Sequence, residues 1–526
     1  MNTSQIKKFA QEARTKLLNL VAGKLESVLT QDSASLRAKA ETIKKLNEEI
    51  KEIGKDALID KVAYTWFNRF VALRFMDAND FQPLGINILS PTQGLESGSP
   101  QILADVQAGI FPENLKLDRN YINDILNGVT ASSNPDNDIY RHILIAVCND
   151  LHRIFPFLFE KIDDYTELLL PDDLTTPFSI VNDVVKGMTA ANCAEVEIIG
   201  WIYQFYISEK KDEVFAAKSS VKKEDIPAAT QLFTPRWIVE YMVQNTVGKL
   251  WLQNKPQSAL RDQMPYFIES PSVKNEDFLK LNSIEELTLL DQACGSGHIL
   301  VYGFELLYKI YEEEGYSPAE IPALIITKNL HGFEIDDRAA QLAILALMMK
   351  ARSYQRRFFN KEIKPNILCY DDVVFNQEEL TSVLVLTKLD KSTELQYDLT
   401  ILEQATNYGS LMIPKSSETF LNGALEKVEN ALQKADLFQQ ELLEKLKLAL
   451  LQLLPLSRQY HCIVDNPPYM GGGNMNKALG DFVKSNYGLQ KYYPSQNKFM
   501  MKVHKYLKYR GIPFEEKPAN TKRVIH

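Results

Sequence analysis

The chain has 526 residues, a formal net charge of −9 at pH 7 and a hydrophobic content of 45%. Because a typical domain has about 150 residues, this length predicts roughly two to four folding units. No apolar run approaches the ~20 residues that cross a bilayer, and the charged amphipathic start lacks the apolar core of a secretion signal, so we expect a cytoplasmic protein without membrane insertion. The acidic balance does not indicate a nucleic-acid binder, although net charge says nothing about local basic patches.

The first half of the chain predicts helices. Apolar residues recur at three- and four-residue steps from Ile6 to Leu25 and again from Leu46 to Leu58. The segment 63–76 is dense in aromatic residues, which we expect to pack against other helices rather than to stack on bases. The lysine-containing segment 210–223 favours a solvated linker, with a phosphate-facing loop as the alternative. We therefore predict a helical N-terminal domain over residues 1–225.

Strands and helices alternate from about residue 285 onward. The expected strands are 287–291, 329–334 and 367–370, and the expected helices are 297–314 and 337–352. This alternation predicts a parallel sheet with crossover helices, a fold that binds ligands at the carboxyl ends of its strands. A helical, charge-rich stretch from about 375 to 455 precedes a further strand at 462–465. We expect that stretch to be an insertion in the sheet domain.

A glycine turn follows the first expected strand. Gly295 and Gly297 let the backbone approach a ligand where a side chain would collide, and the helix that begins there points free amides at a carboxylate. Asp291 is placed to receive an ammonium group, and Glu334, with Asp336 as second choice, to accept both ribose hydroxyls. The long separation between the two acidic positions and the missing third glycine weaken a dehydrogenase interpretation.

Further residues around these strand ends belong to the same predicted cofactor site. Ala293 and Ser296 lie within the glycine turn, and Asp371 or Asp372 follows the third strand, where a carboxylate can bind an adenine amino group. A plain surface aspartate is an equal alternative for the last position. Upstream, Thr234 is expected to cap a helix whose first residue is Pro235.

A second motif, Asn466-Pro467-Pro468-Tyr469, follows the last strand. The exocyclic amine of an aromatic base is a poor nucleophile because its lone pair is delocalised into the ring. Two fixed acceptors, the Asn466 side-chain oxygen and the Pro467 carbonyl, would direct that lone pair at an activated methyl group. Pro468 would hold this geometry, and Tyr469 would stack on a base extracted from the duplex. Together with the glycine turn, the motif predicts methylation of a planar amine by S-adenosyl-L-methionine; a proline turn beside a core tyrosine is the alternative.

Scattered residues outside these motifs predict no metal site. The cysteines at 148, 193, 294, 369 and 462 form no Cys-x-x-Cys pair, so we expect buried reduced thiols and neither a disulfide framework nor bound metal. His298 and His461 flank the two motifs without ligand partners in sequence reach, and packing or hydrogen bonding is their expected role.

The order Phe233-Thr234-Pro235, Asp291 to Gly297, Glu334 and Asn466 to Tyr469 resembles the amino-methyltransferases that modify adenine N6 in DNA. The resemblance implies that Phe233, Thr234 and Pro235 belong to the cofactor site and that Asn466 to Tyr469 form the amine site. The first ten residues and the block 64–76 resemble, more narrowly, the PglX methyltransferases of BREX phage-defence systems. This implies double-stranded DNA as substrate, methylation of host DNA as a self mark, and other BREX defence proteins as partners.

The predicted fold is therefore α/β: a helical N-terminal region and a Rossmann-like methyltransferase domain over residues 226–495 with a helical insertion. The family continues through a target-recognition domain, whereas a basic tail, residues 496–526, closes this chain. The resemblance thus implies a truncated C-terminus and doubtful activity for this chain alone. Transfer to a protein glutamine amide and a non-catalytic cofactor- and DNA-binding assembly subunit stay open as alternatives.

Overall fold

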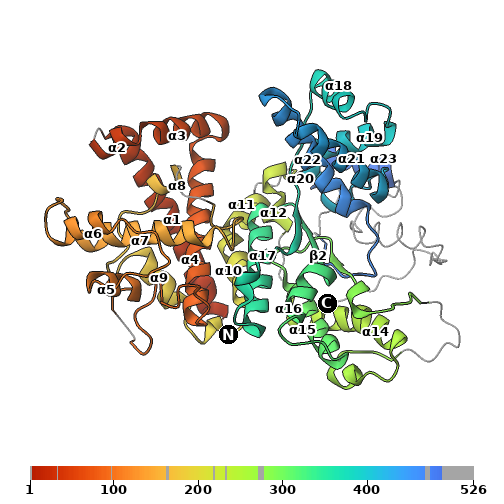
Figure 1. Ribbon diagram of the computed structural model, residues 1–526, viewed down its shortest axis with the longest axis horizontal. Helices are drawn as coiled ribbons and strands as arrows, with labels where there is room; N and C mark the ends of the chain where they lie inside the picture. Colours follow the sequence, from red (N-terminus) through yellow and green to blue (C-terminus); the bar gives the residue numbers. More distant parts are fainter. Residues whose placement is uncertain are drawn as a thin grey trace. The chain divides into compact units, whose positions relative to one another are not determined.

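The computed structural model describes residues 3–31, 34–95, 98–160, 165–216, 220–230, 234–269, 278–467 and 474–487 (Figure 1). The chain forms two compact units. Unit 1 comprises Met1–Lys210, Phe233–Leu368 and Tyr460–Val464, and unit 2 comprises Lys211–Leu232, Cys369–Gln459 and Asp465–His526. Among the described residues, no helix is both long enough and apolar enough to span a bilayer. The domain limits expected from the sequence stay predictions.

Unit 1 begins with a helical region organised around α1 (Thr3–Thr30) and α4 (Lys55–Ala78). One stripe of α1 is buried at the predicted spacing, and this helix packs against α4, α9 (Ile180–Gly187) and α10 (Glu197–Tyr206). The other helices of this region are α2 (Ala34–Ala38), α3 (Ala40–Ile53), α5 (Gln101–Gln107), α6 (Arg119–Leu126), α7 (Pro135–Leu151), α8 (Tyr165–Leu168) and the short η1 (Asn192–Ala194). A further helix, α11 (Ser208–Ala216), begins in unit 1 and continues into unit 2.

The aromatic segment on α4 is buried, as predicted. Trp66, Phe67 and Phe70 are at most 1% exposed, and Phe67 packs on Tyr206 with ring centroids 4.4 Å apart. These rings therefore form part of the hydrophobic core. The first part of segment 210–223 lies in α11, which continues to Ala216, and the linker interpretation stays a prediction.

The sheet of the described residues has four strands in the order β3-β2-β1-β4. They are β1 (Leu289–Asp291), β2 (Leu330–Glu334), β3 (Asn366–Cys369) and β4 (Cys462–Ile463). β1 pairs in parallel with both β2 and β4, so Asp291 lies opposite Gly332 and Leu290 opposite Ile463. The alternating pattern thus predicted the strands and a parallel sheet, but it did not predict that β1 lies between β2 and β4.

Helices connect the first three strands. α15 (His298–Glu313) follows β1 and contacts β1, β2 and α17 (Asp337–Tyr354), and α17 follows β2. Upstream of the sheet, α13 (Arg236–Val243) packs on α15. The remaining elements of this part are η3 (Gln244–Gly248), α14 (Lys249–Asn254), η4 (Ala259–Gln263), η5 (Ile284–Glu286), α16 (Ile321–Leu324), η6 (Ile325–Asn329) and η7 (Phe358–Lys361).

The predicted cap of α13 is wrong. The helix begins at Arg236, and Pro235 occupies the N-cap position with φ −53° and ψ 140° and no side-chain cap. The Pro235 carbonyl accepts the first helical bonds, from the amides of Ile238 and Val239. Because Pro235 has an extended ψ of 140° rather than a helical one, Thr234 lies one residue before the N-cap.

Unit 2 is helical in its described residues. It contains η2 (Lys223–Asp225), α12 (Ile226–Thr230), α18 (Gln377–Leu386), α19 (Thr393–Leu402), α20 (Ala405–Tyr408), η8 (Gly409–Leu411), α21 (Glu418–Leu432), α22 (Leu437–Ser457) and α23 (Lys477–Tyr487). α21 and α22 form a hairpin, and α18 and α19 pack on α22. Lys223 pairs with Asp372, which also accepts the amide and hydroxyl of Thr406 at 3.0 Å each.

Candidate cofactor site and the adjoining strand

The glycine turn joins β1 to α15 and is fixed by backbone hydrogen bonds. Asp291 is 1% exposed and accepts the Ala293 amide at 3.1 Å, and the Cys294 amide donates to the Phe333 carbonyl of β2 at 3.0 Å. Gly295 and Gly297 have φ values of 54° and 83°, in the left-handed region that glycine adopts without strain. The turn is therefore built to bring the start of α15 close to the strand ends, as the glycine motif predicted.

Gly297 is also a point of close helix contact. A Cβ atom at this position would lie 3.1 Å from both Cα and Cβ of Ala343 on α17. Any side chain here would push α17 away from the start of α15, in addition to the conformational cost of its positive φ. Two separate features therefore favour glycine at this position: its positive φ and its close contact with Ala343.

Glu334 ends β2 and closes the turn from the other side. Its Oε2 accepts the Gly295 amide at 2.7 Å, and its Oε1 accepts the amides of Ile335 at 2.8 Å and Asp336 at 3.0 Å. Burial, and then the nearby Asp336 carboxylate, raises the pKa of Glu334 to about 7, although the three amides oppose that shift. The structure therefore brings together Asp291, the glycine turn and Glu334 at the ends of two paired strands.

Asp336 has a structural task in this arrangement. Its Oδ1 caps α17 by accepting the Arg338 amide at 3.2 Å, and its Oδ2 accepts the hydroxyl of Tyr203 from α10. Burial raises the pKa of Asp336, while Arg338 acts in the opposite direction. Of the two candidates for ribose binding, Asp336 is thus the one already held by a buried tyrosine.

The start of α13 lies in a charged cluster next to α15. Arg236 pairs with Glu197 of α10, with Glu240 at 2.9 Å and with Glu305 of α15 at 2.9 Å. Glu305 also accepts Lys350 of α17 at 2.5 Å. Arg236 directly follows Thr234, which is buried, and Pro235, which is exposed.

His298, the first residue of α15, is half-buried beside this cluster. Burial, and then the charge of Arg236, lowers its pKa to about 4, so the imidazole is neutral at pH 7. His461 contacts Thr288 instead, with 3.0 Å between Nδ1 and the hydroxyl oxygen. Both histidines thus have the structural surroundings that the sequence indicated.

β4 leads into the second motif. The Cys462 amide donates to the Thr288 carbonyl and the Val464 amide to the Leu290 carbonyl, each at 2.9 Å. Asn466 and Pro467 follow along the chain and are half-buried and buried respectively. Pro468 and Tyr469, like Phe233, lie outside the described residues. The strand that precedes the amine motif therefore lies directly beside the strand that precedes the glycine turn.

Asp371, the remaining candidate, belongs to unit 2 and is exposed. Its backbone forms two hydrogen bonds with the side chain of Gln452, at 2.9 and 3.1 Å. Its role in adenine binding stays a prediction.

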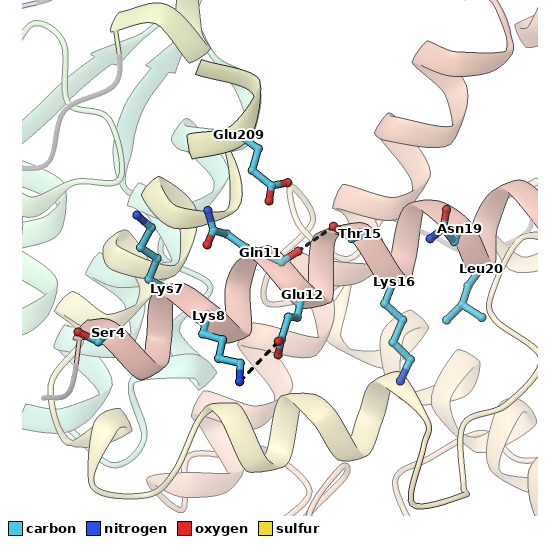
Figure 2. Close-up of a pocket in the computed structure, with 10 residues that line it drawn as sticks. All are labelled: Ser4, Lys7, Lys8, Gln11, Glu12, Thr15, Lys16, Asn19, Leu20 and Glu209. Carbon is cyan, nitrogen blue, oxygen red and sulfur yellow. Dashed lines mark hydrogen bonds and ion pairs between the residues drawn. The ribbon is translucent and has the colours of Figure 1, made fainter. Parts of the chain in front are cut away.

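An open groove of about 860 Å³ in unit 1 contains none of the predicted site residues. Figure 2 shows that its lining comes from the exposed side of α1, with Glu209 added from α11. Two of its lysines already have partners: Lys8 lies 3.8 Å from Glu12, and Lys16 lies 2.5 Å from Asp183. No cluster of described residues has the composition of a metal site.

The sequence is similar to known methyltransferases. Residues 328–513 match the Eco57I restriction-modification methylase family, and residues 270–373 match the DNA-methyltransferase domain of MmeI. The chain is 36% identical over 539 residues to the adenine-specific methyltransferase BrxX of Escherichia coli O9:H4 (strain HS), and 32% identical over 578 residues to the adenine-specific methyltransferase PglX of Lacticaseibacillus casei (strain Zhang). The chain is a homologue of these adenine-specific methyltransferases.

This homologue matches the two relatives over nearly its whole length, 93% and 97%, but spans only 44% and 46% of theirs. A shorter similarity, 27% identity over 184 residues, links 31% of the chain to 15% of a putative type II restriction enzyme and methyltransferase of Methanocaldococcus jannaschii. The similarity confirms the resemblance that the motifs indicated.

Sequence reasoning missed Glu197 and Tyr203, which contact the candidate site from α10. Neither residue belongs to a motif. Their partners, Arg236 for Glu197 and Asp336 for Tyr203, are more than 35 positions away along the chain. Only the fold brings them to the strand ends.

Proposed function

We propose that this chain carries the cofactor-binding and amine-activating parts of an adenine-N6 DNA methyltransferase that uses S-adenosyl-L-methionine. One observation carries the proposal: β4, which leads into Asn466, pairs in parallel with β1, which leads into the glycine turn. In parallel sheets, ligands bind at the carboxyl ends of the strands, so chemistry encoded far apart in the sequence converges there. The names of the two long relatives favour adenine over a protein amide as the acceptor.

The residues present fit this cofactor. Asp291 supplies a buried carboxylate at the end of β1, suited to the ammonium of the methionine part, and the start of α15 supplies amides for its carboxylate. Glu334 supplies the acceptor for the ribose hydroxyls at the end of β2. Thr234, Pro235, Ala293 and Ser296 are the further residues that we assign to the cofactor. When bound, the cofactor supplies a methyl group on a positively charged sulfur.

The chain's own task is then to prepare the acceptor nitrogen. Asn466 and Pro467 each accept one N–H of the adenine amino group, which turns the nitrogen lone pair out of the ring plane. These two acceptors lower the barrier to reaction because they are fixed before the substrate arrives, so that no dipole has to reorient during the reaction. Tyr469 stacks on the flipped base and offsets part of the lost base stacking.

We further propose that the protein acts on double-stranded DNA in the cytoplasm as part of a BREX-type defence system. The resemblance of the first ten residues and of segment 64–76 to PglX methyltransferases supports this assignment, as does the similarity to a relative of that name. Recognition of a particular site requires residues beyond those assigned here.

Transfer of a labelled methyl group to DNA tests the proposal. The substrate is genomic duplex DNA that lacks adenine methylation, because the target sequence is unknown, and the product is identified as N6-methyladenine after digestion. We expect transfer by the parent chain to fall at least a hundredfold in Asn466→Ala, while the Kd for S-adenosyl-L-methionine stays within twofold. Equal transfer by parent and variant, or methylation of a protein amide in place of adenine, would refute it.

A further inference from the structure

We propose that α10 of the helical region positions the cofactor site, with Glu197 and Tyr203 as its two positioning residues. This inference rests on the proposed function, since it concerns the site assigned there to S-adenosyl-L-methionine. It assigns the helical region a role inside the site itself, in addition to any role in binding DNA or partners.

The first contact holds the turn after β2. Tyr203 is 1% exposed, and its hydroxyl donates to Oδ2 of Asp336. The backbone amide of Asp336 donates in turn to Glu334, the proposed ribose acceptor, at 3.0 Å. Removing the hydroxyl leaves the half-buried Asp336 carboxylate with one donor fewer, which is costly where water replaces the lost hydrogen bond poorly. The turn that carries Glu334 then loses its fixed position.

The second contact holds the chain segment before α13. Glu197 pairs with Arg236, whose guanidinium also contacts Glu240 and Glu305. Arg236 directly follows Thr234 and Pro235, which the proposed function assigns to the cofactor. The pair Glu197–Arg236 therefore links α10 to the start of α13, whereas Arg236–Glu240 lies within α13 itself.

Other helices of unit 1 hold α10 in place. α10 packs on α1 and on α17, the helix that Asp336 caps. Arg338, two residues after Asp336, pairs with Asp60 of α4 at 2.6 Å, and Arg14 of α1 lies 3.5 Å from the same carboxylate. One helix thus contacts two separate segments of the site and is itself fixed on both sides.

The chain offers a matched control for each residue. The Tyr206 hydroxyl lies on the same helix and is buried, yet it forms no hydrogen bond with the described residues. Tyr206→Phe therefore removes a buried hydroxyl that has no hydrogen bond with Asp336. Tyr203→Phe removes the hydroxyl that donates to Asp336. Likewise Glu240→Gln removes one carboxylate from Arg236 within α13, whereas Glu197→Gln removes the one that comes from α10.

Hydrogen exchange and cofactor binding test the inference separately. We expect Tyr203→Phe to speed amide exchange in residues 334–338 at least tenfold and to weaken binding of S-adenosyl-L-methionine about tenfold, measured by calorimetry. Tyr206→Phe should change neither by more than twofold. Glu197→Gln should weaken binding more than Glu240→Gln, with faster exchange at the start of α13.

The outcomes separate this inference from the proposed function. Exchange and affinity in Tyr203→Phe equal to those of Tyr206→Phe would overturn the role of α10, whatever the parent binds. Faster exchange at 334–338 in a protein whose parent binds no S-adenosyl-L-methionine would support the positioning of this turn and refute the cofactor assignment.

Discussion

The carboxylate of Glu334 accepts the amide of Gly295 at 2.7 Å, so the end of β2 holds the glycine turn that follows β1. The same carboxylate is buried, and its pKa is raised to about 7. A group that fixes the turn and titrates near neutral pH makes the site sensitive to the pH at which it works.

The first prediction is that cofactor affinity rises with pH. Below pH 7 the Glu334 carboxyl is mostly protonated and is a poor acceptor for two ribose hydroxyls, whereas above pH 7 it is ionised. With a pKa near 7, the Kd for S-adenosyl-L-methionine should fall about tenfold between pH 6 and pH 8. Calorimetry at the two pH values measures this change. Glu334→Gln, which removes the titrating group, should bind more weakly with little change over that range; a parent as insensitive as this variant would contradict the prediction.

The second prediction concerns the two ends of α15. Gly297 and Gly315 have nearly the same φ, 83° and 82°, but only Gly297 has neighbours within 4 Å of an added Cβ. Gly315→Ala should therefore lower the free energy of unfolding by about 1 kcal/mol, the cost of the left-handed conformation. Gly297→Ala should lower it by about 3 kcal/mol, because the contact with Ala343 adds to that cost. Urea denaturation of both variants measures the difference, and equal losses would show that α17 adapts without cost.

The third prediction compares an ion pair between α15 and α17 with one at the C-terminal end of α15. Lys350 and Glu305 have side chains that are 10% and 15% exposed, whereas Lys255 and Glu314 are 47% and 28% exposed. Lys350→Met leaves the half-buried Glu305 with Arg236 as its remaining ion-pair partner among the described residues, and should cost about 2–3 kcal/mol of stability. Lys255→Met should cost less than about 1 kcal/mol, because water screens that pair. Thermal unfolding at two salt concentrations distinguishes them, and similar losses would argue against the burial of Glu305.

The fourth prediction concerns residues 474–487, which follow the amine motif along the chain. Asn407 and Asn476 exchange two side-chain hydrogen bonds, at 2.9 and 3.2 Å, and Tyr408 stacks on Phe482 with centroids 4.0 Å apart. The variants Asn407→Ala and Asn476→Ala should each speed hydrogen exchange in residues 474–487, with a coupling of about 1 kcal/mol in a double-mutant cycle.

Asn486→Ala is the control for this pair, since the Asn486 side chain donates to the Phe482 carbonyl within its own helix. It should leave exchange around Asn476 unchanged. Additive effects of the two paired substitutions would show that the amides act independently.

Local patterns predicted much of the sheet region. The expected strand 329–334 and helix 337–352 are observed as β2 (Leu330–Glu334) and α17 (Asp337–Tyr354), because the apolar spacing that defines such elements lies within a few residues. The glycine turn was predicted for the same reason, since its φ values are a property of two residues. The Thr234 cap was wrong because the helix begins one residue later than expected, with Pro235 in extended geometry at the N-cap.

The remaining features depend on contacts that no local pattern encodes. The position of β4 beside β1 pairs residues more than 170 apart, and the hydroxyl of Tyr203 meets Asp336 across 133 positions. A tyrosine in an apolar helix predicts burial, but not which polar group its hydroxyl will contact. The amine site stays a prediction, and Pro468 and Tyr469 lie outside the described residues.

The strand order has a consequence for biosynthesis. β1 leaves the ribosome long before β4, and the helices α18 to α22 are made in between. At ~5–20 residues per second, one edge of the nascent sheet waits on the order of ten to thirty seconds for its last strand. An unpaired strand edge attracts other chains. Slower translation between codons 370 and 460 should therefore increase the demand of this protein for chaperones.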